Sequence, residues 1–397
     1  MRIGFQVLSL KPGSVGGQEV FVRRLLSQLT AQLGSDRLVL FARPQFVVHP
    51  DLDSLLRDRR VEVIAEDPEP HYGPGYSDWI LRQLDDVALD VVCFPLSFFY
   101  PRPLPMPVVL HVPDIQHEYF PQYFSDEQLA WPRERIAPSV ALADAVVTYS
   151  DFSARCLRER MFVPADALHV IPSGGFTTPE IASLRTDWDP AHARSTRVLP
   201  DAPFVLYPAG DWPHKNHETL LQAFALLVRA GRPEHLVLTG MISQRRTELM
   251  ALVERLGIAE RVHLLGCVRR RDLVGLYSSA AALAFPSRFE GFGQPLVEAM
   301  QMGCPVVASR AAGVMETAGN AAAFAEDDPV AWAERLIEVL ANEALQEELV
   351  RRGARRAAEF DWDHCARRHM QVLRSTASRA AIGVGVPASA LPGIRGA

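Results

Sequence analysis

The chain has 397 residues, of which 48% are hydrophobic and 22% are charged. This length exceeds the roughly 250–300 residues that one hydrophobic core accommodates, so two domains are expected. The balance of residue types excludes a disordered or fibrous protein. The formal net charge of -6 excludes the overall positive field of a nucleic-acid-binding protein, so any anion must be bound locally.

The amino terminus enters a strand pattern at once, without the apolar block of a signal peptide, and no apolar run reaches the length of a membrane span. The five cysteines are far apart and show no C-x-x-C spacing, which indicates reduced thiols. These features predict a cytoplasmic protein. Scattered arginine pairs and the triplet Arg269–Arg271 are interpreted as solvated faces, with peripheral contact at the inner face of a membrane as the alternative.

Residues 1–180 alternate β-rich runs with helical patterns, which predicts a parallel sheet covered on both faces. The expected strands are Arg2–Leu10, Arg37–Arg43, Val61–Ala65, Val91–Ser97, Pro107–Asp114, Ala145–Ser150 and His169–Ser173. Residues 181–203 carry several helix breakers and no sustained apolar period, so we expect a linker there.

Alternation restarts at residue 204 and predicts a second doubly wound domain over 204–360. Its expected strands are Phe204–Gly210, Leu236–Gly240, Val262–Val268, Ala281–Ser287, Pro305–Ser309 and Ala321–Ala325. A last helix is expected over 361–376. The stretch 377–397 is rich in Ala, Gly, Pro and Ser without a period, which predicts a disordered tail.

The segment Phe285–Met300 is expected to follow a strand and to open a helix, since Pro295 suits the first helical turn. Gly291 and Gly293 allow the backbone to approach a ligand, and the free N–H groups of a first helical turn bind anionic oxygens. Glu290 and Glu298 are carboxylates that can accept hydrogen bonds from sugar hydroxyls. Taken singly, either acid also fits a solvated loop or a helix-dipole partner.

Lys215 ends the run Tyr207–Lys215, which follows the first strand of the second domain and precedes a helix. Its ammonium therefore lies near a helix amino terminus, where two positive elements converge on an anion such as a leaving diphosphate. A lysine in this position is otherwise usually a solvent-exposed residue.

The two acids and their flanking residues resemble the E-x7-E signature of the retaining glycosyltransferases of family 4, and the W-P-H-K-N-H form at 212–217 resembles a mannosyltransferase-like branch of that family. The resemblance implies an α/β fold of the GT-B type, with two Rossmann-like domains facing each other across a cleft and the 361–376 helix packing towards the first. It implies that Glu290 contacts the donor sugar, Glu298 the ribose hydroxyls and Lys215 the diphosphate. The donor-binding residues that it implies are Gly16, Gly17, Arg288, Gly291, Phe292, Gly293, Gln294, Leu296 and Glu298.

The sequence departs from the family pattern at one point, because Gly210 and Asp211 stand where many members have an arginine. Arg288 is the candidate for a compensating charge. The stretch from His111 resembles the H-D-x-Q-H stretch of the same branch, with an extra residue before Asp114. It implies that His111 donates to the donor substrate and that Asp114 and His117 shape the acceptor side, with a structural histidine as the alternative for either ring.

The family implies transfer of a hexosyl group from a nucleotide diphosphate sugar to a saccharide, lipid-linked or other hydroxyl acceptor. It implies no cofactor and no metal. The branch favours GDP-mannose, and rhamnosyl or glucosyl donors are alternatives. A GT-B nucleotide-sugar epimerase and an inactive sugar-nucleotide-binding protein stay open as other functions.

Overall fold

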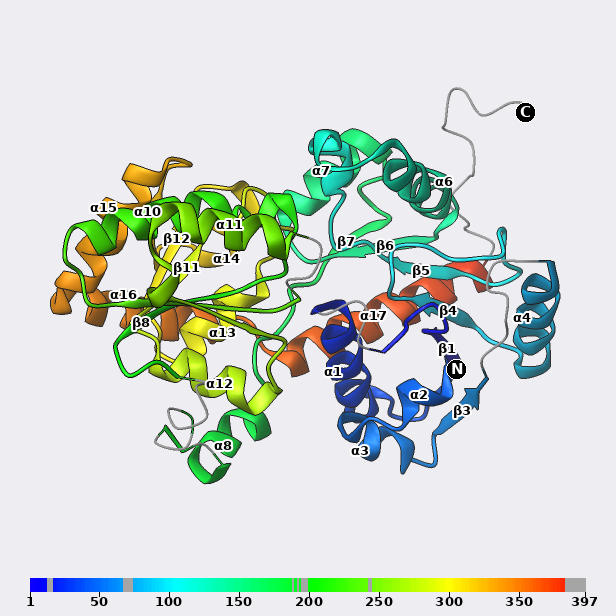
Figure 1. Ribbon diagram of the computed structural model, residues 1–397. Coiled ribbons are helices and arrows are strands. Elements are labelled where there is room, and N and C mark those ends of the chain that lie inside the picture. Colours follow the sequence, from blue (N-terminus) through cyan, green and yellow to red (C-terminus); the bar gives the residue numbers. More distant parts are fainter. Residues whose placement is uncertain are drawn as a thin grey trace. The chain divides into compact units, whose positions relative to one another are not determined.

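The computed structural model describes residues 1–12, 17–66, 74–187, 189–190, 193, 199–241 and 245–382, with the side chains of 74–75 and 183–187 outside the description. The chain divides into two compact units. The first unit comprises Met1–Pro172 and Trp362–Ala397, and the second comprises Ser173–Asp361. Each unit is built on one parallel sheet (Figure 1).

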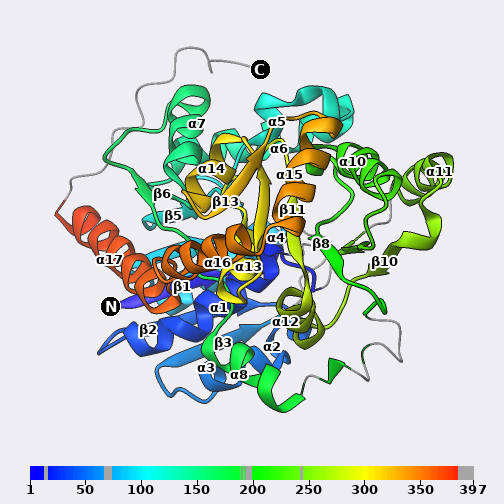
Figure 2. The same ribbon diagram turned by 90° about the vertical axis from the view of Figure 1, so that its left-hand side faces the viewer.

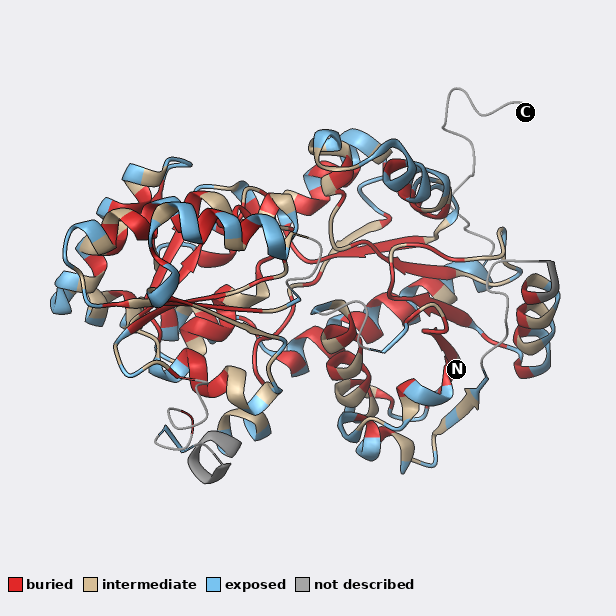
Figure 3. Cartoon of the chain, in the orientation of Figure 1, coloured by how far each residue is buried: buried red, intermediate tan, exposed pale blue. Residues whose placement is uncertain are grey.

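The first unit has a seven-stranded sheet in the order β3-β2-β1-β4-β5-β6-β7. Its strands are β1 (Arg2–Gln6), β2 (Arg37–Ala42), β3 (Val61–Ala65), β4 (Val91–Phe94), β5 (Val108–His111), β6 (Ala145–Thr148) and β7 (Leu168–Val170). Its helices are α1 (Gly17–Gln32), α2 (Pro44–Val47), α3 (Asp53–Leu56), α4 (Pro74–Val87), α5 (Gln116–Tyr119), α6 (Asp126–Leu142), α7 (Asp151–Met161) and α17 (Trp362–Ala381). The central strands are buried along their whole length (Figure 3), as expected of a sheet covered on both faces.

The second unit has a six-stranded parallel sheet in the order β10-β9-β8-β11-β12-β13. Its strands are β8 (Phe204–Pro208), β9 (His235–Thr239), β10 (Val262–Gly266), β11 (Ala282–Phe285), β12 (Val306–Ser309) and β13 (Ala322–Ala325). Its helices are α8 (Thr178–Asp187), α10 (His217–Arg229), α11 (Arg246–Leu256), α12 (Arg270–Ser279), α13 (Gln294–Gln301), α14 (Ala312–Ala318), α15 (Pro329–Ala341) and α16 (Glu343–Ala357).

Both sheets have the doubly wound order, in which the chain returns to the middle and then builds outwards in the opposite direction. In the second unit this reversal lies between β8 and β11, which pair directly with Ala282 opposite Val205. Ligands of such sheets bind outside the carboxyl ends of the strands at the point of reversal. The loops after β8 and β11 are therefore where a ligand site is expected in this unit.

The last helix belongs to the first unit although it follows the second in the sequence (Figures 1 and 2). Helix α17 packs against α1 and β4 and buries Trp362. Arg374 of α17 pairs with Asp36 at 2.9 Å, and Gln32 donates to Asp363 at 2.6 Å. Residues about 330 positions apart thus close the first unit.

Two predicted boundaries differ from the structure. The first unit ends at Pro172 rather than at residue 180, and the segment expected as a linker at 181–203 contains the end of α8 and belongs to the second unit. The reason is a pair of long-range hydrogen bonds: the side chain of Gln301 accepts from the Phe176 N–H at 2.6 Å and donates to the Phe176 carbonyl at 3.3 Å. Helix α17 continues to Ala381, five residues into the predicted disordered tail, and residues 383–397 lie outside the description.

Candidate active site

Two loops of the second unit meet where the strand order reverses. The first follows β8 and contains a short 3₁₀ helix over Pro213–Lys215, and the second follows β11 and leads into α13. The Arg288 N–H donates to the His214 carbonyl at 2.8 Å, which joins the two loops backbone to backbone. The point of reversal therefore carries residues from both predicted motifs.

The turn that carries Lys215 is fixed on both sides of that residue. The Tyr207 hydroxyl donates to the Lys215 carbonyl at 2.7 Å. Asn216 has a left-handed backbone (φ 57°) and lies buried, donating to Asp327 at 2.8 Å and to the Pro286 carbonyl at 3.3 Å. Asparagine is one of the few residues other than glycine that visits this conformation routinely. The backbone of Lys215 is thus held by a strand residue and by the neighbouring loop.

The Lys215 ammonium forms an ion pair with Glu290. Its Nζ donates to Oε1 of Glu290 at 2.6 Å, and the two side chains are 20% and 11% exposed. The bond joins residues 75 positions apart in the sequence. A charge-assisted bond between partly exposed groups holds both side chains in place and still allows an incoming phosphate to compete for the ammonium. The sequence predicts Lys215, Glu290 and His111 as the catalytic residues, and the structure brings the first two together.

Two histidines beside Lys215 are neutral at physiological pH. Burial, with a smaller contribution from the Lys215 charge, lowers the pKa of His214 to about 2. Burial also lowers the pKa of His217 to about 4. Arg288, the candidate for a compensating charge, pairs with Asp327 at 2.7 Å.

The turn into α13 depends on Gly293, which has a φ of 84°. A Cβ added at this position would lie 2.9 Å from Cδ1 of Leu296, so a side chain is disfavoured by both conformation and space. Pro295 occupies the first turn of α13, where its missing N–H is harmless. Gly291 and Phe292 are buried, and Gln294 donates to the Gly174 carbonyl at 3.4 Å. The predicted start of the helix is confirmed.

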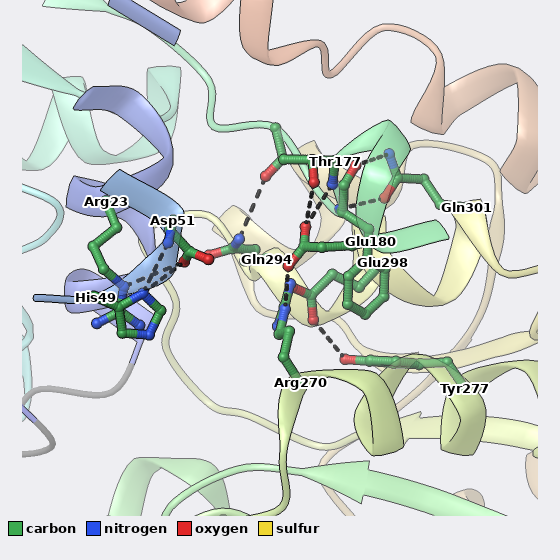
Figure 4. A network of polar contacts seen from close by, with 12 residues as sticks. Arg23, His49, Asp51, Thr177, Glu180, Arg270, Tyr277, Gln294, Glu298 and Gln301 are labelled. Atoms are coloured by element: carbon green, nitrogen blue, oxygen red, sulfur yellow. Dashed lines mark hydrogen bonds and ion pairs between the residues drawn. The ribbon is translucent and has the colours of Figure 1, made fainter. Parts of the chain in front are cut away.

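Glu298 lies on α13 and is nearly buried, with a side-chain exposure of 5%. Arg270 donates to its Oε1 at 2.6 Å and the Tyr277 hydroxyl donates to its Oε2 at 3.1 Å (Figure 4). Both partners lie on α12 and were missed by the sequence reasoning, which interpreted the arginine triplet 269–271 as a solvated face. No local pattern distinguishes the middle arginine, because its partner is 28 residues away.

His111 ends β5 in the core of the first unit and is fully buried. Its ring stacks on that of His369 from α17 with centroids 4.7 Å apart, and Phe21 of α1 lies 5.8 Å away. Neither ring nitrogen has a hydrogen-bond partner among the described residues. Burial, with the neighbouring His369, lowers the pKa of His111 well below its usual value. These surroundings are compatible with the structural histidine that the sequence left as the alternative, and the contact of His111 with the donor stays a prediction.

Asp114 and His117 follow β5 in the first unit. Asp114 accepts a hydrogen bond from the N–H of Gln116, the first residue of α5, at 3.2 Å. His117 is buried on α5, and its Nε2 lies 3.7 Å from Glu118. Burial lowers the pKa of His117. Gly17 is the first residue of α1 and is exposed, whereas Gly16 lies outside the described residues.

Within the described ranges, no group of three or more His, Cys, Asp or Glu side chains has an arrangement suited to a metal ion. Over the same ranges, no helix combines the length and the apolar character needed to cross a bilayer.

Comparison with known proteins identifies the family. The family model described as Glycosyltransferase Family 4 matches residues 15–174, and the model described as Glycosyl transferases group 1 matches residues 190–356. The chain belongs to the family 4 glycosyltransferases. The loops that carry Lys215, Glu290 and Glu298 all lie in the group 1 region of this enzyme.

Relatives of the glycosyltransferase include mannosyltransferases. The chain is 29% identical over 300 residues to the O-antigen chain mannosyltransferase B of Escherichia coli, which covers 74% of this chain and 75% of the relative. It is 33% identical over 254 residues to a D-inositol 3-phosphate glycosyltransferase of Xylanimonas cellulosilytica, with 60% and 59% covered. The chain thus spans about three fifths of the length of that second relative.

Solved structures show the fold. The glycosyltransferase matches WaaG, a glycosyltransferase involved in lipopolysaccharide biosynthesis, with a TM-score of 0.71, 17% identity and coverage of 94% of this chain and 99% of the other. It matches the sucrose-phosphate synthase of Thermosynechococcus elongatus with a TM-score of 0.73, 22% identity and coverage of 95% and 99%. The fold is therefore GT-B, as the sequence predicted.

Proposed function

We propose that this glycosyltransferase moves a hexosyl group, mannose from GDP-mannose, to a hydroxyl of a saccharide or lipid-linked acceptor, with retention of anomeric configuration and without a metal ion. The observation that carries the proposal is the Lys215–Glu290 pair at the carboxyl ends of β8 and β11. This pair places an ammonium, for the leaving diphosphate, within 2.6 Å of a carboxylate, for the sugar hydroxyls. The mannosyl donor is supported by the relatives named mannosyltransferases.

The step that needs help from the protein is departure of the nucleoside diphosphate. The bond from the anomeric carbon to the phosphate oxygen breaks, and its electron pair leaves with the diphosphate. Negative charge then grows on that oxygen, where Lys215 and the first-turn N–H groups of α13 stabilise it. Because this charge is greatest in the transition state, the interaction accelerates the reaction rather than only binding the substrate.

Retention follows when the acceptor enters on the face from which the diphosphate leaves. The acceptor oxygen forms the new bond to the anomeric carbon, and its hydroxyl proton passes to the departing phosphate oxygen. No protein carboxylate acts as a covalent nucleophile in this route, so it needs no pair of acids at glycosidase spacing. In this mechanism Glu290 binds a hydroxyl of the donor sugar and Glu298 binds the ribose. Lys215 and the helix amides supply the positive charge that a metal ion would otherwise provide.

Composition adds support for a special role of Lys215. Of the 41 basic residues, 39 are arginines and only Lys11 and Lys215 are lysines. In a chain that uses arginine almost everywhere else, a lysine at the β8 loop indicates a need for a compact, single-point cation. The planar fork of arginine is larger and is suited to bidentate contacts instead.

A donor panel tests the proposed reaction. The enzyme is incubated with GDP-mannose, UDP-glucose and dTDP-rhamnose, each with and without EDTA, and slow donor hydrolysis is followed by mass spectrometry. We expect GDP-mannose to be hydrolysed fastest and EDTA to have no effect, and proton NMR of a transfer product should show the anomeric configuration of the donor. Preference for another sugar would overturn the mannosyl assignment, and loss of turnover in EDTA would overturn metal independence. A donor turned over to an isomeric nucleotide sugar would indicate an epimerase.

Lysine labelling tests the contact to the diphosphate directly. Acetylation with a limiting amine-reactive ester, followed by peptide mass spectrometry, measures the labelling rate at Lys215 with Lys11 as the internal reference. We expect GDP to slow labelling of Lys215 and to leave Lys11 unchanged. Equal labelling of Lys215 with and without saturating GDP would contradict the proposed contact.

A further inference from the structure

We propose that Arg270 is a positioning residue that sets the orientation of the Glu298 carboxylate for binding the ribose hydroxyls of the donor. The inference rests on the proposed function, because it assigns Arg270 a role through Glu298. It makes the middle residue of the arginine triplet 269–271 part of the site.

The three arginines 269–271 have different partners in the structure. Arg270 donates through one terminal nitrogen to Glu298 at 2.6 Å and through Nε to Glu180 at 2.8 Å. Arg269 and Arg271 pair with Asp272 on the same helix and are 65% and 51% exposed, against 29% for Arg270. Three identical neighbours therefore have different surroundings, and only the middle one reaches α13.

The guanidinium of Arg270 is fixed from several directions. Its centre lies 4.2 Å from the centroid of the Phe176 ring, within the range of a cation–π contact. Glu180 is itself held by Thr177, whose N–H and hydroxyl donate to Oε2 at 2.7 and 2.9 Å (Figure 4). The planar fork of arginine thus joins two carboxylates with little rotational freedom, which a lysine ammonium would not reproduce.

This arrangement determines how Glu298 meets a ligand. Arg270 bonds to one oxygen of the carboxylate and Tyr277 to the other, so the plane of the group is set. Because each carboxylate oxygen can accept two hydrogen bonds, these contacts are compatible with a vicinal diol.

The residues that hold Arg270 on the side away from Glu298 lie just before the predicted linker at 181–203. Phe176, Thr177 and Glu180 precede or begin α8 and are attached to α13 through Gln301 and to α12 through Arg270. A Cβ at Gly175 would lie 2.2 Å from the amide oxygen of Gln301, so the chain passes closer to α13 there than any other residue type allows. The close approach of the backbone at Gly175 to α13 therefore holds in place the residues that contact Arg270.

The test compares a ribonucleotide with its dideoxy form. Dissociation constants of GDP and 2′,3′-dideoxy-GDP are measured by titration calorimetry for the wild type and for Arg270→Gln, Arg270→Lys, Tyr277→Phe and Glu298→Gln. A hydrogen bond to a charged group is strong enough that we expect the wild type to bind GDP about tenfold to hundredfold more tightly than dideoxy-GDP. Arg270→Gln should weaken GDP about tenfold and dideoxy-GDP less than about twofold.

Control variants distinguish a positioning role of Arg270 from a general effect of its charge and from a loss of folding stability. Arg269→Gln and Arg271→Gln remove the same charge one residue away and should leave both constants unchanged. Arg270→Lys should restore only part of the GDP affinity, and Arg270→Gln combined with Glu298→Gln should be no weaker than Glu298→Gln alone. Melting temperatures establish that each variant is folded, and Tyr277→Phe, which keeps all charges, carries the test if Arg270→Gln does not fold.

Several outcomes would overturn the inference. Equal weakening of GDP and dideoxy-GDP by Arg270→Gln would mean a structural role, and the same loss in Arg269→Gln would mean a field effect. If the wild type did not distinguish the two nucleotides, the ribose role of Glu298 would fail and the inference with it, while transfer activity would stand. If the wild type bound neither nucleotide, the proposed function itself would fail.

Discussion

Two buried polar clusters, one in each unit, solve the same physical problem in opposite ways. In the first unit, the rings of His111 and His369 stack, and burial lowers the pKa of both. Both ring nitrogens of His111 and Nε2 of His369 lack a partner among the described residues, whereas Nδ1 of His369 lies 2.7 Å from the Cys365 carbonyl. In the second, Glu298 and Glu180 each form an ion pair with the guanidinium of Arg270. Burial of a titratable group requires either neutrality or pairing. The first cluster packs its rings together without an opposite charge, and the second joins two carboxylates to one guanidinium.

The largest effect is expected from removing a charge in the second unit. Lys215→Ala removes the cation that stabilises the leaving diphosphate, so we expect kcat to fall about 10²–10³-fold, as for loss of one preorganised donor in other enzymes. Transfer is measured by mass spectrometry with the preferred donor. Lys11→Ala is the matched control and should retain activity. A Lys215→Ala enzyme with unchanged kcat would remove the central residue of the proposed mechanism.

The histidine cluster of the first unit is tested by the pH dependence of the free energy of unfolding. The pKa of His369 is lowered to about 4 by burial, from an ordinary 6.5, so the folded state binds fewer protons than the unfolded state between these values. Stability is therefore fully present above pH 6.5 and is lost as the pH falls towards 4, by on the order of 3 kcal/mol from this group. His369→Phe should flatten that part of the curve of unfolding free energy against pH, measured by urea denaturation.

His364 lies on the same helix and is exposed, so His364→Phe provides the control for the pH experiment. It should leave the curve between pH 6.5 and 4 as in the wild type. An equal flattening by both substitutions would show that burial against His111 is not the cause.

A smaller effect is expected at the turn that carries Lys215. Asn216→Ala loses the bonds to Asp327 and Pro286 and places alanine at a φ of 57°, so we expect a loss of about 2–3 kcal/mol in unfolding free energy. Asn216→Gly keeps the conformation without strain and should lose about 1 kcal/mol less. Urea denaturation of the two variants measures the difference. Equal losses would mean that the hydrogen bonds alone matter.

The smallest effect is expected at His111, where substitution distinguishes a structural histidine from one that contacts the donor. His111→Phe keeps a planar ring in the buried stack, so the free energy of unfolding should change by less than about 1.5 kcal/mol. If the histidine is structural, transfer activity should stay close to the wild type. A large fall in kcat with unchanged stability would instead support the donor contact that the family resemblance implied.

The sequence was sufficient wherever the information is local. Alternating strands and helices gave both parallel sheets, because burial on two faces produces continuous apolar runs. The turn at Gly293 and the helix start at Pro295 follow from single-residue conformational preferences. Glu290, Glu298 and Lys215 could be predicted as site residues because each lies just after a strand or at a helix start, where the doubly wound fold directs side chains towards a ligand.

Only the tertiary structure decided which groups meet. The ion pair of Lys215 with Glu290, the choice of Arg270 over Arg269 and Arg271, and the burial of His111 by a helix from the far end of the chain all join residues distant in sequence. Periodicity and residue preference report neighbours within a few positions, whereas these contacts depend on strand order and on the path of α8 and α17. The sequence therefore determined the fold class and the family, and long-range packing determined the charge state and surroundings of each site residue.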